Sequence, residues 1–259
     1  MRFGVCAGFD ALETLALAGF DYIEPSVVNL LQPEQPEAEI LPPLVPILAR
    51  ALLRPEAFNL LVPGDLKIVG PDTDGYRQAL YLDAAFERVA RIGGKVVVFG
   101  SGGARRIPDG WPTATAHNQL LHFLRQCGII AGHFGITVAI EPLNTGECNF
   151  INSVAEAAAL AQEVNHPNIG VLSDLYHVTQ DGQSYDETRD AISWLRHVHV
   201  AGAGRRAPTA ADYEYLREYF AVLKAAGYAG RISIEANWND LAAQAAEARE
   251  VLERAWESA

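Results

Sequence analysis

The sequence has few cysteines, and none is spaced for a zinc site or a disulfide framework. Its 259 residues include only three, Cys6, Cys127 and Cys148, and no two of them form a C-x-x-C pair. The odd number argues against a disulfide framework, and the absence of such pairs argues against a zinc ribbon. The N-terminus also lacks a basic region followed by an apolar stretch, so no secretion signal is expected. Unpaired thiols without such a signal are typical of a cytoplasmic protein.

Long apolar runs and an excess of positive charge are missing as well. No stretch approaches the roughly 18 consecutive apolar residues of a membrane-spanning helix, so no membrane association is expected. The formal net charge is −12. A chain this acidic repels a phosphate backbone, which argues against a nucleic-acid partner. Hydrophobic residues make up 49% of the sequence, which is enough to bury a large core.

Short apolar runs alternate with longer amphipathic segments from end to end. The runs interpreted as strands are Phe3–Ala7, Tyr22–Glu24, Phe58–Val62, Lys95–Gly100, Thr137–Glu141, Gly170–Asp174, His197–Ala201 and Arg231–Glu235. Several are apolar and β-branched throughout, as in KVVVFG and ITVAIE. Strands of this kind are covered on both faces, as in a parallel sheet beneath helices.

Segments with helical periodicity lie between these strands. They are Asp72–Arg91, Ala114–Phe134, Val154–Val164, Ala211–Ala226 and Asp240–Trp256. The segment Glu37–Arg54 is expected to be helical too, with Pro42, Pro43 and Pro46 breaking or kinking its first half.

The alternation predicts an α/β protein, a (β/α)₈ TIM barrel in a single domain over residues 1–259. No linker or shift in composition divides the chain. A doubly wound open sheet is the alternative architecture. The sequence contains neither G-x-G-x-x-G after the first strand nor a P-loop, so nucleotide binding has little support.

An ionisable residue ends or lies within each of the last four predicted strands: Glu141 in AIE, Asp174 in VLSD, His199 in HVHV and Glu235 in ISIE. Taken singly, each is more often a cap, an ion-pair partner or a core histidine. Active sites of these barrels form at the carboxyl ends of the strands, which lie about 5 Å apart, so the four side chains are expected to converge. Three carboxylates buried together need protons or a cation. Such ligands suit one divalent metal ion, with manganese, magnesium, cobalt or iron ahead of zinc.

Four stretches around these residues carry a resemblance to a known superfamily. They are IEPLNTGECNFINSVAEA, VLSDLYH, HVHVAGAGRR and GYAGRISIE. With the alternation over the whole chain, they resemble the xylose-isomerase-like barrel superfamily of sugar isomerases and epimerases. Ketose 3-epimerases of the tagatose/psicose type and hydroxypyruvate isomerases are the most similar members.

The resemblance implies specific roles for site residues. Glu141 and Glu235 would be both metal ligands, of Mn²⁺ in the first instance, and the catalytic acid/base pair that works through an enediolate. His177 in DLYH, Arg205 six residues after His199 and Glu147 in NTGECNF would bind the substrate. The implied substrate is a small sugar or hydroxy-carbonyl compound. Barrels of this kind often pair, so the resemblance allows a homo-oligomer, but the sequence itself does not indicate the oligomeric state.

A ketose 3-epimerase is the leading function. A hydroxypyruvate-type aldose–ketose isomerase and an inosose-type dehydratase remain alternatives, because the same ligands support both. Abasic-site endonucleases of this superfamily need further histidines, but strand three ends in LVPGD and strand four in VFGSG. A non-catalytic sugar-binding barrel would not require two opposed glutamates.

Some residues have two interpretations. Glu24 ends the second strand and either faces the mouth of the barrel or forms a structural ion pair. Arg105, Arg106 and Arg206 would recognise a phosphate or carboxylate if they point inward, and otherwise face solvent. The segment GSGGARR is interpreted as a tight loop after strand four.

Overall fold

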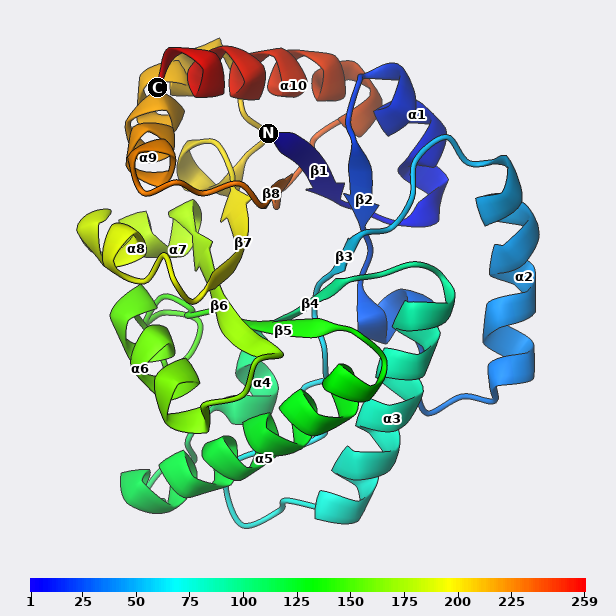
Figure 1. Ribbon diagram of the computed structural model, residues 1–259, viewed down its shortest axis with the longest axis vertical. Helices are drawn as coiled ribbons and strands as arrows, with labels where there is room; N and C mark the ends of the chain where they lie inside the picture. Colours follow the sequence, from blue (N-terminus) through cyan, green and yellow to red (C-terminus); the bar gives the residue numbers. More distant parts are fainter.

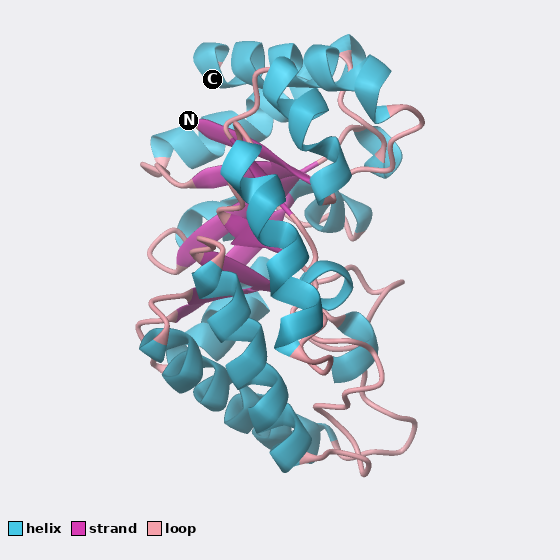
Figure 2. Ribbon diagram, turned by 90° about the vertical axis from the view of Figure 1, so that its right-hand side faces the viewer, coloured by secondary structure: helices cyan, strands magenta, loops and turns pink.

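The computed structural model describes residues 1–259 and forms a barrel of parallel strands surrounded by helices (Figures 1 and 2). The strands are β1 (Arg2–Cys6), β2 (Tyr22–Glu24), β3 (Ala57–Phe58), β4 (Val96–Phe99), β5 (Thr137–Ile140), β6 (Ile169–Asp174), β7 (Leu195–Val200) and β8 (Arg231–Ile234). They form one sheet in the order β2-β1-β8-β7-β6-β5-β4-β3. The prediction of a (β/α)₈ barrel is confirmed.

The barrel is nearly closed between β2 and β3. Isolated parallel bridges join Ile23 to Pro55 and Ser26 to Asn59. The Val27 N–H also donates to the Asn59 carbonyl at 2.9 Å. These isolated contacts join β2 to β3 in place of a regular ladder.

The helices are α1 (Leu12–Leu17), α2 (Glu37–Arg50), α3 (Gly75–Arg91), α4 (Gly102–Arg105), α5 (Thr113–His133), α6 (Val154–Val164), α7 (Leu175–Gln180), α8 (Asp186–Asp190), α9 (Tyr213–Ala225) and α10 (Leu241–Ser258). Side-chain caps begin several of them. Ser153 accepts from the Glu156 N–H at 3.1 Å to begin α6, for example. None of these helices has the length and apolar character needed to cross a membrane.

The side chains of each strand alternate between two cores. Val97 and Phe99 of β4 belong to the large cluster beneath the helices. Val96 and Val98 belong to a separate cluster of six buried residues from β2 to β6. This alternation follows from the period of two in a strand, so the small cluster fills the inside of the barrel.

Three predicted elements differ from the structure. The segment GSGGARR was interpreted as a tight loop, but it contains the short helix α4, in which the Ala104 N–H donates to the Ser101 carbonyl at 3.0 Å. The third strand was expected over Phe58–Val62, but it ends at Phe58 because Leu60 adopts a left-handed conformation with φ of 49°. The segment predicted to break or kink at its prolines is a single helix, which ends at Arg50 rather than Arg54. Its buried leucines anchor one face of α2, and this packing outweighs the missing proline N–H groups.

Candidate active site

Four donor side chains meet at the carboxyl ends of the last four strands. One ligand atom from each lies within 4.8 Å of the others; the residues are Glu141, Asp174, His199 and Glu235. Nδ1 of His199 lies 3.4 Å from Oε1 of Glu141 and 3.8 Å from Oε2 of Glu235. The predicted convergence of these residues is therefore present.

The alternation along the strands explains why these side chains meet. Glu141 lies two positions after Ala139, and Asp174 lies two positions after Leu172. Ala139 and Leu172 both belong to the cluster inside the barrel. Residues two apart share a face, so the carboxylates form the next layer above that apolar floor.

Buried donor atoms in this cluster have no hydrogen-bond partner. They are Oε1 of Glu141, Oδ2 of Asp174 and Nδ1 of His199. Burial, followed by the charges of Glu235 and Glu141, raises the pKa of Asp174 to about 8. The carboxylates therefore retain a proton at neutral pH unless a cation replaces it. The donor set fits a divalent cation such as Mn²⁺, because it offers carboxylate oxygens and one imidazole nitrogen.

Glu24 fixes the orientation of the His199 ring from below. Its Oε1 lies 2.9 Å from Nε2 of His199, and both side chains are fully buried. Nε2 therefore carries the proton that is donated to Glu24, and the other ring nitrogen faces the carboxylates. Burial opposes a charge on His199, but Glu24 raises its pKa well above the usual value. A cation bound at Nδ1 would displace that second proton.

The same carboxylate is the centre of a buried network. Its Oε2 lies 2.7 Å from Nε2 of His197 and accepts from the Ser233 hydroxyl at 2.5 Å. The Tyr22 hydroxyl lies 2.7 Å from Ser233 and donates to it, since the serine proton is already used. Burial alone would raise the pKa of Glu24, but His199 and His197 hold it well below its usual range. Of the two interpretations of Glu24, the structure supports the ion pair.

His177 presents a single N–H group toward the cluster. Its Nδ1 accepts from the main-chain N–H of Asn144 at 3.2 Å and lies 2.8 Å from the Asn144 side-chain amide. Burial lowers the pKa of His177 to about 4, so the ring is neutral. The proton therefore resides on Nε2, which is buried, unpartnered and 3.7 Å from Oδ2 of Asp174. This geometry leaves an N–H free to donate to an oxygen of a bound molecule.

Arg205 links the cluster to the outer rim of the mouth. Its guanidinium donates to Glu235 and, at 3.1 Å, to Oε1 of Glu147. The guanidinium also lies over the Tyr176 ring, with 4.9 Å between its carbon and the ring centroid. A hollow of about 400 Å³ opens beside these residues and is also lined by Asn237. The three predicted substrate contacts thus border the cluster.

The other arginines considered as anion-binding residues do not point into the mouth. Arg106 donates to the main-chain carbonyl of Glu147 at 2.7 Å. Arg206 is paired with Asp212 at 2.7 Å. Arg105 is fully buried and faces main-chain carbonyls. The expectation that these arginines bind an anion or face solvent is wrong for Arg105, and the hydrogen bonds of all three arginines are made to groups of the protein.

Several residues of the site were not identified in the sequence. His197 had a usable signal, because it lies two positions before His199 and therefore shares its face of the strand. Asn144 and Tyr176 lie in the stretches that carry the resemblance, but nothing in their spacing indicated a contact. Ser233 and Tyr22 gave no signal, since their hydroxyls matter only through Glu24.

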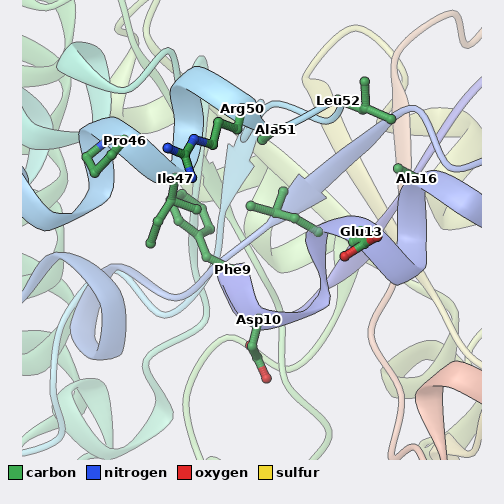
Figure 3. Close-up of a pocket in the computed structure, with 10 residues that line it drawn as sticks. Phe9, Asp10, Glu13, Ala16, Pro46, Ile47, Arg50, Ala51 and Leu52 are labelled. Carbon is green, nitrogen blue, oxygen red and sulfur yellow. The ribbon is translucent and has the colours of Figure 1, made fainter.

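A hollow of about 630 Å³ lies away from this cluster. It opens between α1 and α2 (Figure 3), and its walls include Phe9, Leu12, Ile47 and Leu52. It contains none of the four donors. This mainly apolar hollow is therefore not part of the candidate active site.

Comparison with known proteins gives relatives of related function. A ketose 3-epimerase of Arthrobacter globiformis is 30% identical over 106 residues, which are 40% of this chain and 36% of that protein. A putative hydroxypyruvate isomerase of Mus musculus is 26% identical over 144 residues, which are 51% of each chain. The chain thus matches well under two thirds of the length of these two relatives.

Similarity to solved structures and to a family pattern extends over almost the whole chain. The structure of a D-allulose 3-epimerase from Methylomonas sp. in complex with D-allulose has a TM-score of 0.83 at 21% identity, over 98% of this chain and 96% of that chain. This likeness shows the common fold. The sequence pattern of the xylose isomerase-like TIM barrel matches residues 12–255. The chain belongs to the xylose isomerase-like TIM barrel family.

Proposed function

We propose that this protein is a divalent-metal-dependent ketose 3-epimerase. Glu141, Asp174, His199 and Glu235 hold the metal, which we take to be Mn²⁺, with Mg²⁺, Co²⁺, Fe²⁺ and Zn²⁺ as alternatives. The proposal rests on one observation, which is that the four side chains converge while buried donor atoms of Glu141, Asp174 and His199 have no partner of their own. Protons could neutralise the clustered carboxylates, but a bound cation would both neutralise them and give the unpartnered donor atoms a ligand.

The two glutamates supply the proton transfer. When bound, the metal polarises the substrate carbonyl and stabilises the negative charge that develops as a C–H proton leaves. One glutamate takes the proton from C3 to form the enediolate, and the other returns a proton to the opposite face, which inverts that carbon. Glu141 follows β5 and Glu235 follows β8, so they reach the mouth from different sides. The configuration of the substrate decides which of the two acts first.

The neighbouring polar groups orient the substrate. The Nε2–H of His177 donates to one substrate oxygen, and the guanidinium of Arg205 donates to another. The exposed carboxylate of Glu147 accepts from a hydroxyl. Because each of these side chains already has a second partner in the protein, its direction is fixed before the substrate arrives.

The charges at the mouth favour an uncharged ketose. Arg205 already pairs with Glu147 and Glu235, Arg206 pairs with Asp212, and Arg106 donates to the main-chain carbonyl of Glu147 rather than into the mouth. A carboxylate substrate such as hydroxypyruvate would need a cation that is not neutralised. Isomerisation of hydroxypyruvate is therefore the second candidate, supported by the similarity to the mouse relative, and an inosose-type dehydratase is the third.

Isotope exchange tests this proposal. The Mn²⁺-loaded protein is incubated in D₂O with a panel of ketoses, hydroxypyruvate and inosose, and deuterium incorporation is followed by NMR. We expect deuterium at C3 of a ketose together with the appearance of its C3 epimer, and loss of exchange after chelation. Labelling of hydroxypyruvate alone, or loss of water from inosose, would transfer the assignment to the corresponding alternative. Exchange with no compound, or full activity after verified metal removal, would refute it.

We also place this activity in the cytoplasm. Cys6, Cys127 and Cys148 are free thiols, which are typical of a reducing compartment. Fractionation of the native host, followed by detection of the protein, tests the assignment.

A further inference from the structure

The glycine-rich segment after β4 ends in a buried cation. Arg105 is fully buried at the end of α4, although a guanidinium keeps its charge at any physiological pH. Its hydrogen-bond acceptors are main-chain carbonyls, and its carbon lies 5.5 Å from the centroid of the Phe99 ring. Burying a charge in this way is costly, so the position has a use that offsets the cost.

The carbonyls that Arg105 reaches belong to two neighbouring strand ends and one loop. Nη1 donates to the carbonyl of Phe99, the last residue of β4, at 3.1 Å. Nη2 donates to the carbonyls of Glu141 at 2.7 Å and Ile151 at 3.4 Å. Arg105 therefore fixes both ends of the segment 141–151 against the end of β4.

The segment 141–151 supplies several groups of the proposed active site: Glu141, Asn144 and Glu147. Residues next to Arg105 also form hydrogen bonds to the middle of the segment 141–151. Arg106 donates to the Glu147 carbonyl at 2.7 Å, and the Cys148 thiol donates to the Gly102 carbonyl at 3.7 Å. The whole GSGGARR segment thus serves as a support for this loop.

The glycine at position 102 permits this close contact. A Cβ at Gly102 would lie 2.8 Å from Cδ1 of Leu143, which is too close for a carbon pair. The buried charge has a counterpart in the same loop. Burial lowers the pKa of Arg105, and the Cys148 thiol and the Glu141 carboxylate oppose that shift. The guanidinium donates to the main-chain carbonyl of Glu141, so it lies beside the strand end that carries this carboxylate.

We propose that Arg105 is a positioning residue that holds Glu141 and the segment 141–151 in place for metal binding and proton transfer. This inference rests on the proposed function, because it concerns the same metal and the same glutamate. Arg105 does not reach the mouth, so it acts through the main chain and through its charge. Its loss should change the affinity for metal and the rate of turnover more than the binding of substrate.

Replacement of the side chain tests this role, with a matched control elsewhere in the barrel. Arg88 on α3 is also buried and donates only to main-chain carbonyls, those of Leu31, Gln32 and Gln35, at 2.6 to 2.7 Å. Arg105→Met and Arg88→Met therefore remove the same kind of contact. Only Arg105, however, contacts the segment that carries Glu141. Arg105→Lys keeps the charge without the forked geometry.

Mn²⁺ affinity, measured by competition with a chelating dye, and kcat and KM at saturating Mn²⁺ are the readouts. We expect Arg105→Met to weaken Mn²⁺ binding and to lower kcat by about 10- to 100-fold each, as is usual for groups that support metal ligands. KM should change less than kcat, and Arg105→Lys should recover part of the loss. Arg88→Met should stay close to the unchanged protein in both affinity and kcat. Equal Mn²⁺ affinity and kcat in folded Arg105→Met would overturn the inference.

Amide hydrogen exchange of the metal-free protein supplies a readout that does not depend on activity. We expect Arg105→Lys to speed exchange in residues 143–151, whereas Arg88→Lys should leave those amides unchanged. Unchanged exchange in Arg105→Lys would also overturn the inference, even if Arg105→Met fails to fold. If the unchanged protein neither binds Mn²⁺ nor exchanges substrate protons, the proposed function fails instead, and the exchange comparison still decides the role of Arg105 in the loop.

Discussion

Glu24 accepts a hydrogen bond from Nε2 of His199 over 2.9 Å, and this contact decides which ring nitrogen faces the carboxylates. Once a cation displaces the second proton, an imidazole that donates from Nε2 presents its lone pair on Nδ1. That nitrogen is buried and has no partner in the protein. The carboxylate beneath the ring thus directs Nδ1 toward the cluster in which we propose that the metal binds.

Glu24→Gln should weaken metal binding. A glutamine can accept from one histidine through its oxygen, but its NH₂ group would meet the N–H of the other, so one of the rings must turn. We expect the Mn²⁺ affinity, measured by competition with a chelating dye, to fall by about 10- to 100-fold. Glu56→Gln is the control, because Glu56 pairs with Arg2 and Arg231 at the opposite ends of the strands. Equal losses in both variants would show that the effect is general rather than local.

The layer of carboxylates could be predicted because it follows from strand alternation alone. Glu141 and Asp174 each lie two residues after an apolar residue that points into the barrel. Parallel strands place their carboxyl ends together, so the two carboxylates come close to each other. The same rule would have added His197 to the site, had the pair in HVHV been considered as one face of a strand. The alternation of side chains between the two faces of a strand can therefore be predicted from the sequence.

The structure around the carboxylates and at the rim of the barrel could not be predicted, because it depends on contacts between segments that are distant in the sequence. Arg105 ends the short helix α4 in a glycine-rich segment, where an exposed arginine is the usual outcome, and the approach of residues 141–151 buries it. Leu60 ends β3 through a left-handed conformation that a leucine rarely adopts. In α2, three buried leucines maintain a helix despite its prolines. In each case tertiary packing overrides a local preference.

Glu235→Gln should separate proton transfer from substrate binding. The amide keeps the size and one oxygen of the side chain, but it cannot take a proton from carbon. We expect kcat for epimerisation to fall by about 10²- to 10⁴-fold, while substrate affinity measured by calorimetry at saturating Mn²⁺ stays within about tenfold. Glu147→Gln should instead act mainly on KM, because Glu147 is proposed only to bind a hydroxyl. A Glu235→Gln variant that turns over at the normal rate would exclude Glu235 as acid or base.

Gly100→Ala should displace the carboxylate of Glu141, which we propose to be catalytic. A Cβ at this position would lie 2.2 Å from Oε2 of Glu141, so the carboxylate must move. A displacement of about 1 Å at a reacting group costs on the order of a hundredfold in rate, and we expect a loss of that size in kcat. The control is Gly75→Ala at the start of α3, where a Cβ meets no atom within 4 Å. Unimpaired kcat in Gly100→Ala would show that Glu141 need not occupy its present position.

Asp212→Asn should lower stability at neutral pH and lose this effect in acid. The buried Asp212 carboxylate accepts from the N–H groups of Ala203 and Thr209 and pairs with Arg206. Burial alone would raise the pKa of Asp212, but these hydrogen bonds hold it below its usual value. A lowered pKa stabilises the fold at pH values above the unfolded pKa of about 4, and this contribution disappears as the pH falls through the folded pKa.

We therefore expect urea denaturation at pH 7 to show that Asp212→Asn lowers the free energy of unfolding by about 2 kcal/mol, which is typical of hydrogen bonds to a charged group. Below about pH 4 the difference from the unchanged protein should shrink. The exposed Asp190 provides the control, since Asp190→Asn should change stability little at either pH. A difference for Asp212→Asn that stays constant down to the lowest pH would mean that the ionised carboxylate contributes nothing beyond its shape.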